Sequence, residues 1–251
     1  MTMKVLDLFS GIGGFSLGLE RAGFETVAFC EIEKYPQKVL AKHWPNIPIY
    51  EDVRELTYDR LRSDGIAGID VICGGFPCQD ISIAGKQKGI GEGTRSGLWS
   101  ECARLVGEIR PQYAIFENVR ALLSGQQGRW FQRVLFDLSE IGYDAEWHCI
   151  SASELGAHHH RDRVWIVAYP SSSRPKKPES ETQEALLRRN AWWCSSVEQS
   201  RVDWWLLEPR ICRMANGVPD YAQRLKALGN AVVPPIPELI GRAIMAAENE
   251  R

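Results

Sequence analysis

The chain has 251 residues, of which 44% are hydrophobic and 25% are charged, and its formal net charge is −2. These values are typical of a globular protein, either one large domain or one domain with a small lobe, and they exclude collagen-like, coiled-coil and disordered chains. No apolar run reaches the roughly 18 residues that a membrane-spanning helix needs. The net charge also excludes a protein that holds nucleic acid by bulk positive charge. It does not exclude a cleft that is basic locally.

The first two thirds of the chain alternate short apolar runs with helical patterns. Strands are predicted at residues 5–9, 26–31, 70–73, 113–117 and 163–169, with helical patterns between them that include residues 35–42 and 98–109. Strands that alternate with helices in this way form a mostly parallel sheet covered on both faces. We therefore expect a doubly wound, Rossmann-like α/β fold.

The pattern changes after Pro170. A polar connector at 171–178 is followed by two adjacent tryptophan pairs among few other apolar residues, which predicts a lobe with a miniature core. An ordinary packed pattern returns near Leu225, and a final helix is predicted from Pro237 to about Glu248. The predicted division is a main domain of residues 1–168 and 222–251 and an inserted lobe of residues 169–221.

A glycine-rich loop, Asp7-Leu-Phe-Ser-Gly-Ile-Gly-Gly14, joins the first predicted strand to the first helix. Glycines let the backbone approach a ligand there, and free helix N–H groups bind an anion or a carboxylate. Glu31 ends the next strand, where a carboxylate accepts hydrogen bonds from ribose hydroxyls. Ser16 replaces a glycine of the dinucleotide pattern, which disfavours NAD and FAD. The glycine loop could also be a tight turn that binds no ligand. Asp52 could hold an adenine amino group, or it could be a helix cap or a surface residue.

A second motif, Gly74-Gly-Phe-Pro-Cys-Gln-Asp-Ile-Ser82, follows a predicted strand directly. A cysteine fixed by a proline in this place can act as a nucleophile, although a buried thiol is the commoner fate of cysteine. The seven cysteines form no CxxC pair, and residues 1–9 lack the pattern of a signal peptide. Both observations favour a reducing cytoplasm.

The sequence resembles the DNA (cytosine-5)-methyltransferases, and the residues of its motifs are most similar to those of phage and prophage members. Five segments match the family's motifs in the family's order, between residue 4 and about residue 245: the glycine loop, Pro77-Cys78, Glu117-Asn-Val119, Arg161-Asp-Arg163 and Gly229-Asn-Ala-Val-Val-Pro234. The resemblance implies a Rossmann-like S-adenosylmethionine-dependent methyltransferase sheet, located in the cytoplasm of a bacterial or phage-infected cell.

The resemblance further implies transfer of a methyl group from S-adenosylmethionine to carbon 5 of a cytosine flipped out of duplex DNA. Carbon 5 becomes nucleophilic only after a thiolate adds to carbon 6, and Cys78 would supply that thiolate. Glu117 would hydrogen-bond ring nitrogen 3 and the exocyclic amine. Arg163, and with less support Arg161, would position the base and its phosphate. The reaction needs no metal.

The resemblance also assigns the binding residues. The expected cofactor pocket is lined by Phe9, Ser10, Gly11, Gly13, Gly14, Glu31, Ile32, Asp52, Val53, Pro77, Leu98, Asn230 and Ala231. The glycine-rich, basic segment 79–97 is expected to close over the flipped base. The expected DNA contacts are Gln79, Ser82, Lys86, Lys88, Arg95, His159, Arg188 and Arg189. The C-terminal helix is expected to pack beside the first helix and to bring Asn230 to the cofactor.

The inserted lobe, rather than the main domain, is expected to choose the DNA sequence. With about fifty residues it is shorter than is usual in the family, which leaves open how long a site it reads unaided. Two alternatives are an RNA methyltransferase and a binding protein that has lost activity, although intact Cys78, Glu117 and Arg163 argue against the second. We expect a monomer acting on double-stranded DNA. The recognition sequence and any partner restriction enzyme stay open.

Overall fold

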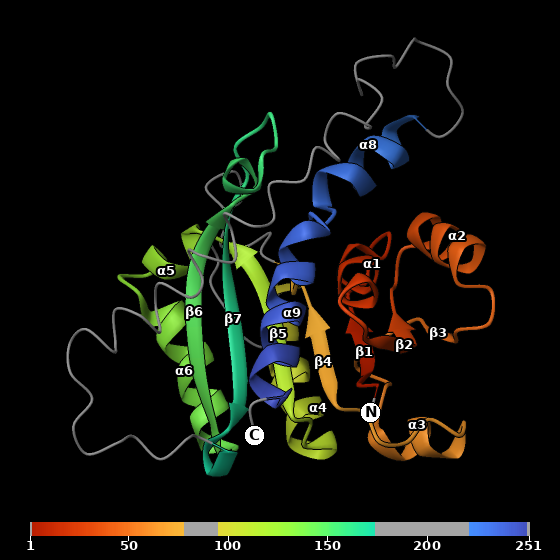
Figure 1. The fold of residues 1–251 in the computed structure, drawn as a ribbon, viewed down its shortest axis with the longest axis horizontal. Coiled ribbons are helices and arrows are strands. Elements are labelled where there is room, and N and C mark those ends of the chain that lie inside the picture. Colours follow the sequence, from red (N-terminus) through yellow and green to blue (C-terminus); the bar gives the residue numbers. More distant parts are fainter. Residues whose placement is uncertain (1, 78–94, 174–220, 250–251) are drawn as a thin grey trace.

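A computed structural model describes residues 2–77, 95–173 and 221–249. Within these residues seven strands form one sheet in the order β3-β2-β1-β4-β5-β7-β6 (Figure 1). Only β7 runs antiparallel to its neighbours β5 and β6, which confirms the mostly parallel sheet. The strands are β1 (Lys4–Leu8), β2 (Glu25–Cys30), β3 (Ile49–Tyr50), β4 (Val71–Gly74), β5 (Tyr113–Val119), β6 (Tyr143–Ser151) and β7 (Asp162–Pro170).

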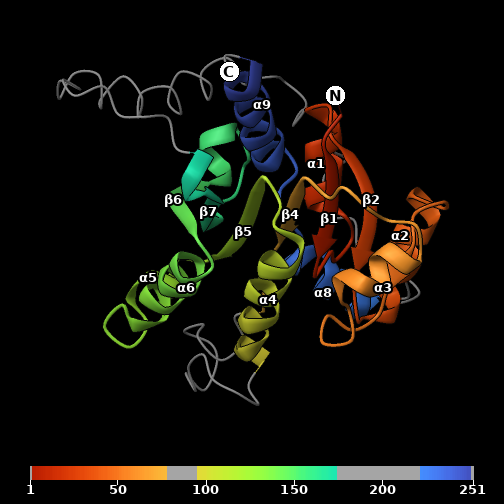
Figure 2. The same cartoon turned by 90° about the horizontal axis from the view of Figure 1, so that it is seen from below.

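Helices cover both faces of the sheet, as Figure 2 shows from below, with α1 and α9 on one face and α4 and α6 on the other. The described α-helices are α1 (Gly14–Arg21), α2 (Lys34–His43), α3 (Tyr58–Ser63), α4 (Trp99–Ile109), α5 (Ala121–Ser124), α6 (Arg129–Glu140), α8 (Tyr221–Asn230) and α9 (Pro235–Asn249). Short 3-10 helices lie at η1 (Arg95–Leu98), η2 (Ala152–Leu155) and η3 (Ser171–Ser173). The doubly wound arrangement predicted from the sequence is therefore confirmed.

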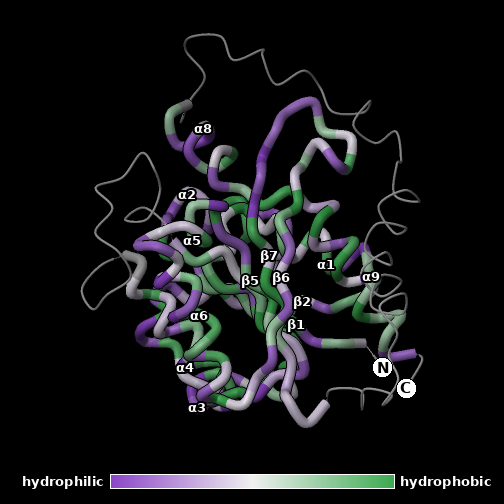
Figure 3. Tube along the Cα trace, turned by 90° about the vertical axis from the view of Figure 1, so that its left-hand side faces the viewer, coloured by the Kyte–Doolittle hydropathy of each residue, from purple (hydrophilic) through white to green (hydrophobic). Residues whose placement is uncertain are grey.

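The alternation of side chains along each strand divides the core into two clusters. Leu6, Ile72 and Phe116 belong to the cluster under α3, α4 and α6, whereas their neighbours Val71 and Ile115 belong to the cluster under α1 and α9. Figure 3 shows the hydrophobic segments gathered at the centre and hydrophilic segments such as α8 at the periphery. Because both faces are covered, the central strands read as continuous apolar runs rather than as alternating ones.

The C-terminal helix α9 packs beside α1, as the sequence predicted. The approach is close at Gly14, where an added Cβ would lie 2.5 Å from the carbonyl oxygen of Val232. No larger residue fits there without displacing backbone. The segment that precedes α9, which carries the last of the five motifs, therefore lies directly on the glycine loop.

The structure also contains elements that were not predicted from the sequence. Residues 120–160 hold α5, α6 and β6, and β7 continues to Pro170, where it still pairs with β6. Most of the predicted lobe, residues 174–220, lies outside the described residues, so the division into domain and lobe stays a prediction. In the parts of the chain that the structure describes, no helix combines the length and the apolar character needed to cross a membrane.

Candidate functional site

The predicted site residues gather at one edge of the sheet. Because β1, β2, β3, β4 and β5 are parallel, their carboxyl ends meet at the same edge, where ligands bind in open α/β sheets. The glycine loop follows β1, Glu31 follows β2, and Pro77 lies three residues after β4. Strand β7 begins at this edge because it runs the other way, so it brings Arg163 to the end of β5.

The glycine loop bends sharply between β1 and α1. Phe9 has a left-handed φ of 52°, which is strained for a residue other than glycine, and Gly13 has a φ of 86°. The Ser10 hydroxyl donates to the Asp7 carbonyl oxygen at 2.6 Å, which fixes the bend from inside. An added Cβ at Gly13 would lie 2.6 Å from the Trp44 ring, so the loop can follow this path only with glycine there.

Glu31 ties the glycine loop to the segment that follows β2. Its Oε2 accepts a hydrogen bond from the backbone N–H of Gly11 at 2.7 Å, and its Oε1 accepts one from the N–H of Glu33 at 2.7 Å. Burial raises the pKa of the Glu31 carboxyl above its ordinary value, and these backbone hydrogen bonds oppose that rise. A carboxylate has about four lone-pair sites, so Glu31 can still accept hydrogen bonds from a ligand.

Asp52 lies two residues after Tyr50, whose carbonyl oxygen accepts a hydrogen bond from the N–H of Glu31 at 2.8 Å. Burial, followed by the charges of Glu31, Asp52 and Asp7, raises the pKa of the Cys30 thiol to about 12. The Asp52 carboxylate forms an ion pair with Arg54, and hydrogen bonds from Arg54 lower the pKa of that carboxyl. A ligand amine at Asp52 would therefore share this carboxylate with Arg54, a residue that no sequence motif indicates.

The remaining cofactor candidates lie at the same edge with different exposures. Ile32 is 59% exposed, which is unusual for a large apolar side chain and leaves its surface available to a ligand. Phe9 and Leu98 are half-buried and pack against the core cluster that contains Val53. Pro77 and Ala231 are half-buried, and Asn230 is exposed at the end of α8.

Glu117 and Arg163 form an ion pair across the antiparallel β5–β7 ladder. The register sets Arg163 opposite Val119, so its side chain shares a face with Glu117, two residues along β5. The Arg163 Nε lies 2.8 Å from Glu117 Oε1, and Glu117 is only 9% exposed. Burial raises the pKa of the Glu117 carboxyl, and the charges of Arg163 and Arg161 oppose that rise.

Arg161 contacts a different partner. Its Nη1 donates to the carbonyl oxygen of Gly229 at 2.8 Å, which fastens the last motif beside the start of β7. Burial, helped by the like charge of Arg163, lowers the pKa of Arg161. The paired arginines thus lie together, but only Arg163 forms an ion pair with Glu117 among the contacts of the described residues.

Asn118 lies in the Glu117-Asn-Val119 motif, and its role could not be predicted from the sequence. It is buried, its Nδ2 donates to the carbonyl oxygen of Phe76 at 3.2 Å, and its Oδ1 accepts from the N–H of Val119 at 2.9 Å. The Phe76 ring packs against Trp99 and Phe116. Together these contacts fix the backbone immediately before Pro77-Cys78.

The other predicted positions fall partly outside the described residues. Cys78, Gln79, Ser82, Lys86, Lys88, Arg188 and Arg189 all lie in the segments that the structure leaves undescribed. Arg95 begins η1, and only its backbone is described. His159 is exposed on the connection from η2 to β7. The predicted DNA contacts and the nucleophile therefore stay predictions.

Asp7, buried beneath the glycine loop, makes the stability of the fold depend on pH. Burial raises its pKa to about 7, although the Ser16 hydroxyl donates to Asp7 Oδ2 at 2.7 Å. As pH rises, the unfolded carboxyl loses its proton first, so the stability contributed by this group is full below about pH 4 and is lost towards pH 7.

Replacement of Asp7 by asparagine should remove this dependence. Between about pH 5 and pH 8 the unfolding free energy of the wild-type protein should fall by about 2–3 kcal/mol more than that of Asp7→Asn. Urea denaturation of both proteins at the two pH values measures the difference and cancels the contributions of other carboxyls. Equal changes in the two proteins would show that Asp7 does not titrate in this range.

Comparisons with known proteins agree with this geometry. A family model described as C-5 cytosine-specific DNA methylase matches residues 3–199, which is more than half of the chain. The chain is 36% identical over 170 residues to the Type II methyltransferase M2.BsuMI of Bacillus subtilis, covering 66% of this chain and 42% of that protein. It is 32% identical over 235 residues to the Type II methyltransferase M.CviJI of Paramecium bursaria Chlorella virus IL3A, covering 93% of this chain and 57% of that protein.

A solved structure shows the same likeness. The crystal structure of a putative DNA modification methyltransferase encoded within an Escherichia coli prophage superposes with a TM-score of 0.59 at 29% identity, covering 72% of this chain and 49% of that one. The chain thus spans about half the length of the relatives it matches. From the family match, the ordered motifs and the sheet that carries them, we conclude that this chain belongs to the C-5 cytosine-specific DNA methylases.

Proposed function

We propose that this chain transfers a methyl group from S-adenosylmethionine to carbon 5 of a cytosine in duplex DNA, through a covalent adduct between Cys78 and carbon 6. The observation that carries the proposal is the buried Glu117–Arg163 pair, which lies at the same sheet edge as the glycine loop and Glu31. Cys78 follows Pro77 at this edge in the sequence. A carboxyl for the base, a cofactor loop and a thiol are the groups that this reaction needs.

The described residues fit S-adenosylmethionine. At Gly11 an added Cβ would meet open space, so a ligand can approach the loop backbone, and Glu31 lies against the same residue. The exposed Ile32 offers an apolar surface for an adenine ring, and Asp52 offers a carboxylate for its amine. When bound, the cofactor supplies an electrophilic methyl group. Glu31 would hold the ribose hydroxyls, and the glycine loop would hold the amino-acid end.

Glu117 would bind the cytosine through ring nitrogen 3 and the exocyclic amine. Its raised pKa increases the fraction of the protonated carboxyl, which donates a hydrogen bond to nitrogen 3 as charge develops there. Arg163, whose Nε lies 2.8 Å from Glu117 Oε1, would hold that oxygen in place whether or not the carboxyl carries its proton. Cys78 would add to carbon 6 as the thiolate and would leave when the carbon-5 proton is lost.

We assign DNA binding to the edge of the sheet where Glu117 and Arg163 lie. The target cytosine must leave the stack because neither a thiol nor a carboxyl reaches it inside a duplex. The segment 79–97 would close over the flipped base, and residues 169–221 would read the flanking sequence.

Labelled S-adenosylmethionine, offered with duplex DNA and with tRNA in parallel, tests the proposal. We expect tritium from the methyl group in the DNA and none above background in the tRNA. Label in the tRNA alone would favour the RNA methyltransferase alternative. Binding of cofactor and DNA without label in either nucleic acid would favour a binding protein that keeps the fold without the activity.

A further inference from the structure

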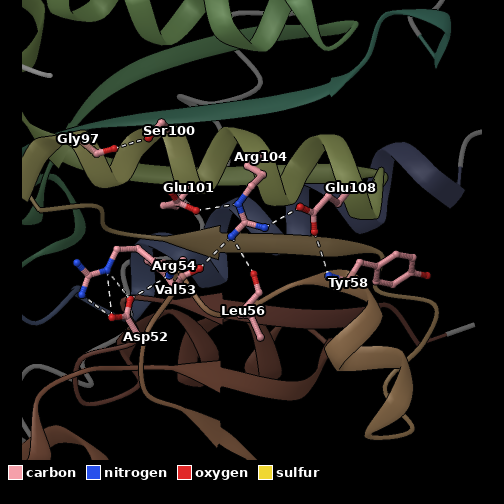
Figure 4. Close-up of polar contacts among 10 residues, drawn as sticks. All are labelled: Asp52, Val53, Arg54, Leu56, Tyr58, Gly97, Ser100, Glu101, Arg104 and Glu108. Carbon is pink, nitrogen blue, oxygen red and sulfur yellow. Dashed lines mark hydrogen bonds and ion pairs between the residues drawn. The ribbon is translucent and has the colours of Figure 1, made fainter. Parts of the chain in front are cut away.

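Arg104 on α4 fastens the segment between β3 and α3 to that helix (Figure 4). Its Nε donates to Glu101 at 2.8 Å and its Nη1 donates to Glu108 at 2.7 Å. Its Nη2 donates to the carbonyl oxygens of Val53 at 3.0 Å and Leu56 at 2.8 Å. All three guanidinium nitrogens are engaged, although the side chain is 30% exposed.

Glu108 adds a third backbone contact to the same segment. Its Oε1 pairs with Arg104, while its Oε2 accepts a hydrogen bond from the N–H of Tyr58 at 3.0 Å. The two side chains therefore satisfy two carbonyls and one N–H within residues 53–58 (Figure 4). Carbonyls without a partner in a part-buried place are costly, so the segment is expected to move when Arg104 is removed.

Regular secondary structure holds this segment only weakly. Strand β3 has two residues, Ile49 and Tyr50, and they pair only with the end of β2. The buried side chains of Val53 and Leu56 pack in the core cluster that also contains residues of α4. Apolar packing thus keeps the side chains of Val53 and Leu56 buried, while the hydrogen bonds of Arg104 and Glu108 fix the position of the backbone.

Two of the expected cofactor contacts, Asp52 and Val53, belong to a segment that is fastened at both ends. At its start, the carbonyl oxygen of Tyr50 accepts a hydrogen bond from the N–H of Glu31 at 2.8 Å. At its end, Val53 and Leu56 are held by Arg104. Asp52 lies between these two points in the chain, so we expect its position relative to Glu31 to depend on both contacts.

We propose that Arg104 is a positioning residue for the adenosine end of the cofactor. Arg104 would not touch the cofactor itself. It would hold Asp52 and Val53, the expected adenine contacts, in position relative to Glu31. This inference rests on the proposed function, because it takes residues 52 and 53 as the adenine contacts. It goes beyond the five sequence motifs, none of which contains Arg104.

A matched control is available on another helix. Arg242 on α9 pairs with Glu238 four residues earlier, with Nη2 at 2.7 Å from Oε1, in an ion pair of the kind that Arg104 makes with its own helix. The described hydrogen bonds of Arg242 reach only Glu238 and no backbone of another segment. Arg242→Met therefore removes an ion pair within a helix without releasing a loop.

The test compares Arg104→Met, Arg104→Lys and Arg242→Met with the wild-type chain. Arg104→Met should weaken calorimetric binding of S-adenosylhomocysteine and raise KM for S-adenosylmethionine, each by about tenfold, while kcat at saturating cofactor changes less than about twofold. Arg104→Lys should restore only part of the affinity, because one ammonium group cannot reach two carboxylates and two carbonyls together. Arg242→Met should bind as the wild type does.

Two further readouts separate positioning from general destabilisation. Amide hydrogen exchange should become faster within residues 53–58 in Arg104→Met and stay unchanged in the strands of the sheet. The ratio of the affinities for S-adenosylhomocysteine and for S-inosylhomocysteine, in which oxygen replaces the adenine amine, should also be smaller in Arg104→Met than in the wild type. Unchanged cofactor affinity, or a loss of kcat as large as the rise in KM, would overturn the proposal.

A different result would contradict the proposed function. A wild-type chain that binds no S-adenosylhomocysteine would contradict cofactor binding itself, whereas the exchange rates of residues 53–58 would still show whether Arg104 holds the segment. Wild-type binding with an unaltered Arg104→Met variant would overturn only the role of Arg104.

Discussion

Replacement of Cys78 by serine is expected to reduce methyl transfer to less than a few per cent of the wild-type rate, with cofactor binding nearly unchanged. A serine hydroxyl is far less ionised than a thiol at neutral pH, so it cannot add to carbon 6 at a useful rate. Cys78 is assigned to the base rather than to the cofactor. Transfer of labelled methyl groups to DNA measures the first effect, and calorimetry with S-adenosylhomocysteine measures the second.

The chain offers a control for this experiment. Cys149 is an exposed cysteine on β6, and Cys149→Ser should retain full activity. Loss of activity in Cys149→Ser would indicate that replacing a cysteine by serine disturbs the protein in general. If Cys78→Ser keeps more than a few per cent of the wild-type activity, Cys78 is not the nucleophile.

Replacement of Glu117 by glutamine should lower kcat by about 10²–10³-fold, as expected when one group that stabilises developing charge is removed. Glutamine keeps the size of the side chain but cannot hold a proton that it shares with ring nitrogen 3. The substitution also removes the charge that Arg163 contacts at 2.8 Å. Single-turnover rates at saturating DNA and cofactor measure this loss.

The control for Glu117 is Glu25, an exposed glutamate at the opposite end of the sheet, where β2 begins. Glu25→Gln should turn over at the wild-type rate. Thermal unfolding of both variants shows whether the Glu117 substitution disturbs the fold through Arg163. A folded Glu117→Gln variant with about half of the wild-type kcat would exclude Glu117 from charge stabilisation, for which losses of about 10²-fold or more are typical.

The central sheet could be predicted from the sequence because its strands are buried on both faces. Strands β1, β2, β4, β5 and β7 lie within one or two residues of the apolar runs that predicted them. Strand β6 gave no such run, because it is an edge strand whose middle residues, such as Trp147, are exposed. Helix α6 does present apolar residues at helical spacing, Trp130, Phe131, Val134 and Leu138, and that signal was available in the sequence.

The candidate site divides in a similar way. Motif residues such as Glu31 and Glu117 could be named from the sequence because their types and order match a family. The contacts between them depend on the register of distant segments, as when the antiparallel β7 brings Arg163 to Glu117. Arg104 could not be singled out, because arginine between glutamates at helical spacing is typical of a solvent-facing helix surface. Its contacts with Val53 and Leu56 exist only in the folded chain.

Bisulfite sequencing of DNA from a host that lacks cytosine-5 methylation, after expression of this chain, shows whether the chain methylates cytosine in DNA. The measurement covers every cytosine of the host genome, so it detects methylation at any recognition sequence. We expect cytosines that resist conversion at one short recurrent sequence, and full conversion in cells that express Cys78→Ser. Full conversion in cells that express folded wild-type protein able to bind S-adenosylhomocysteine would contradict this expectation.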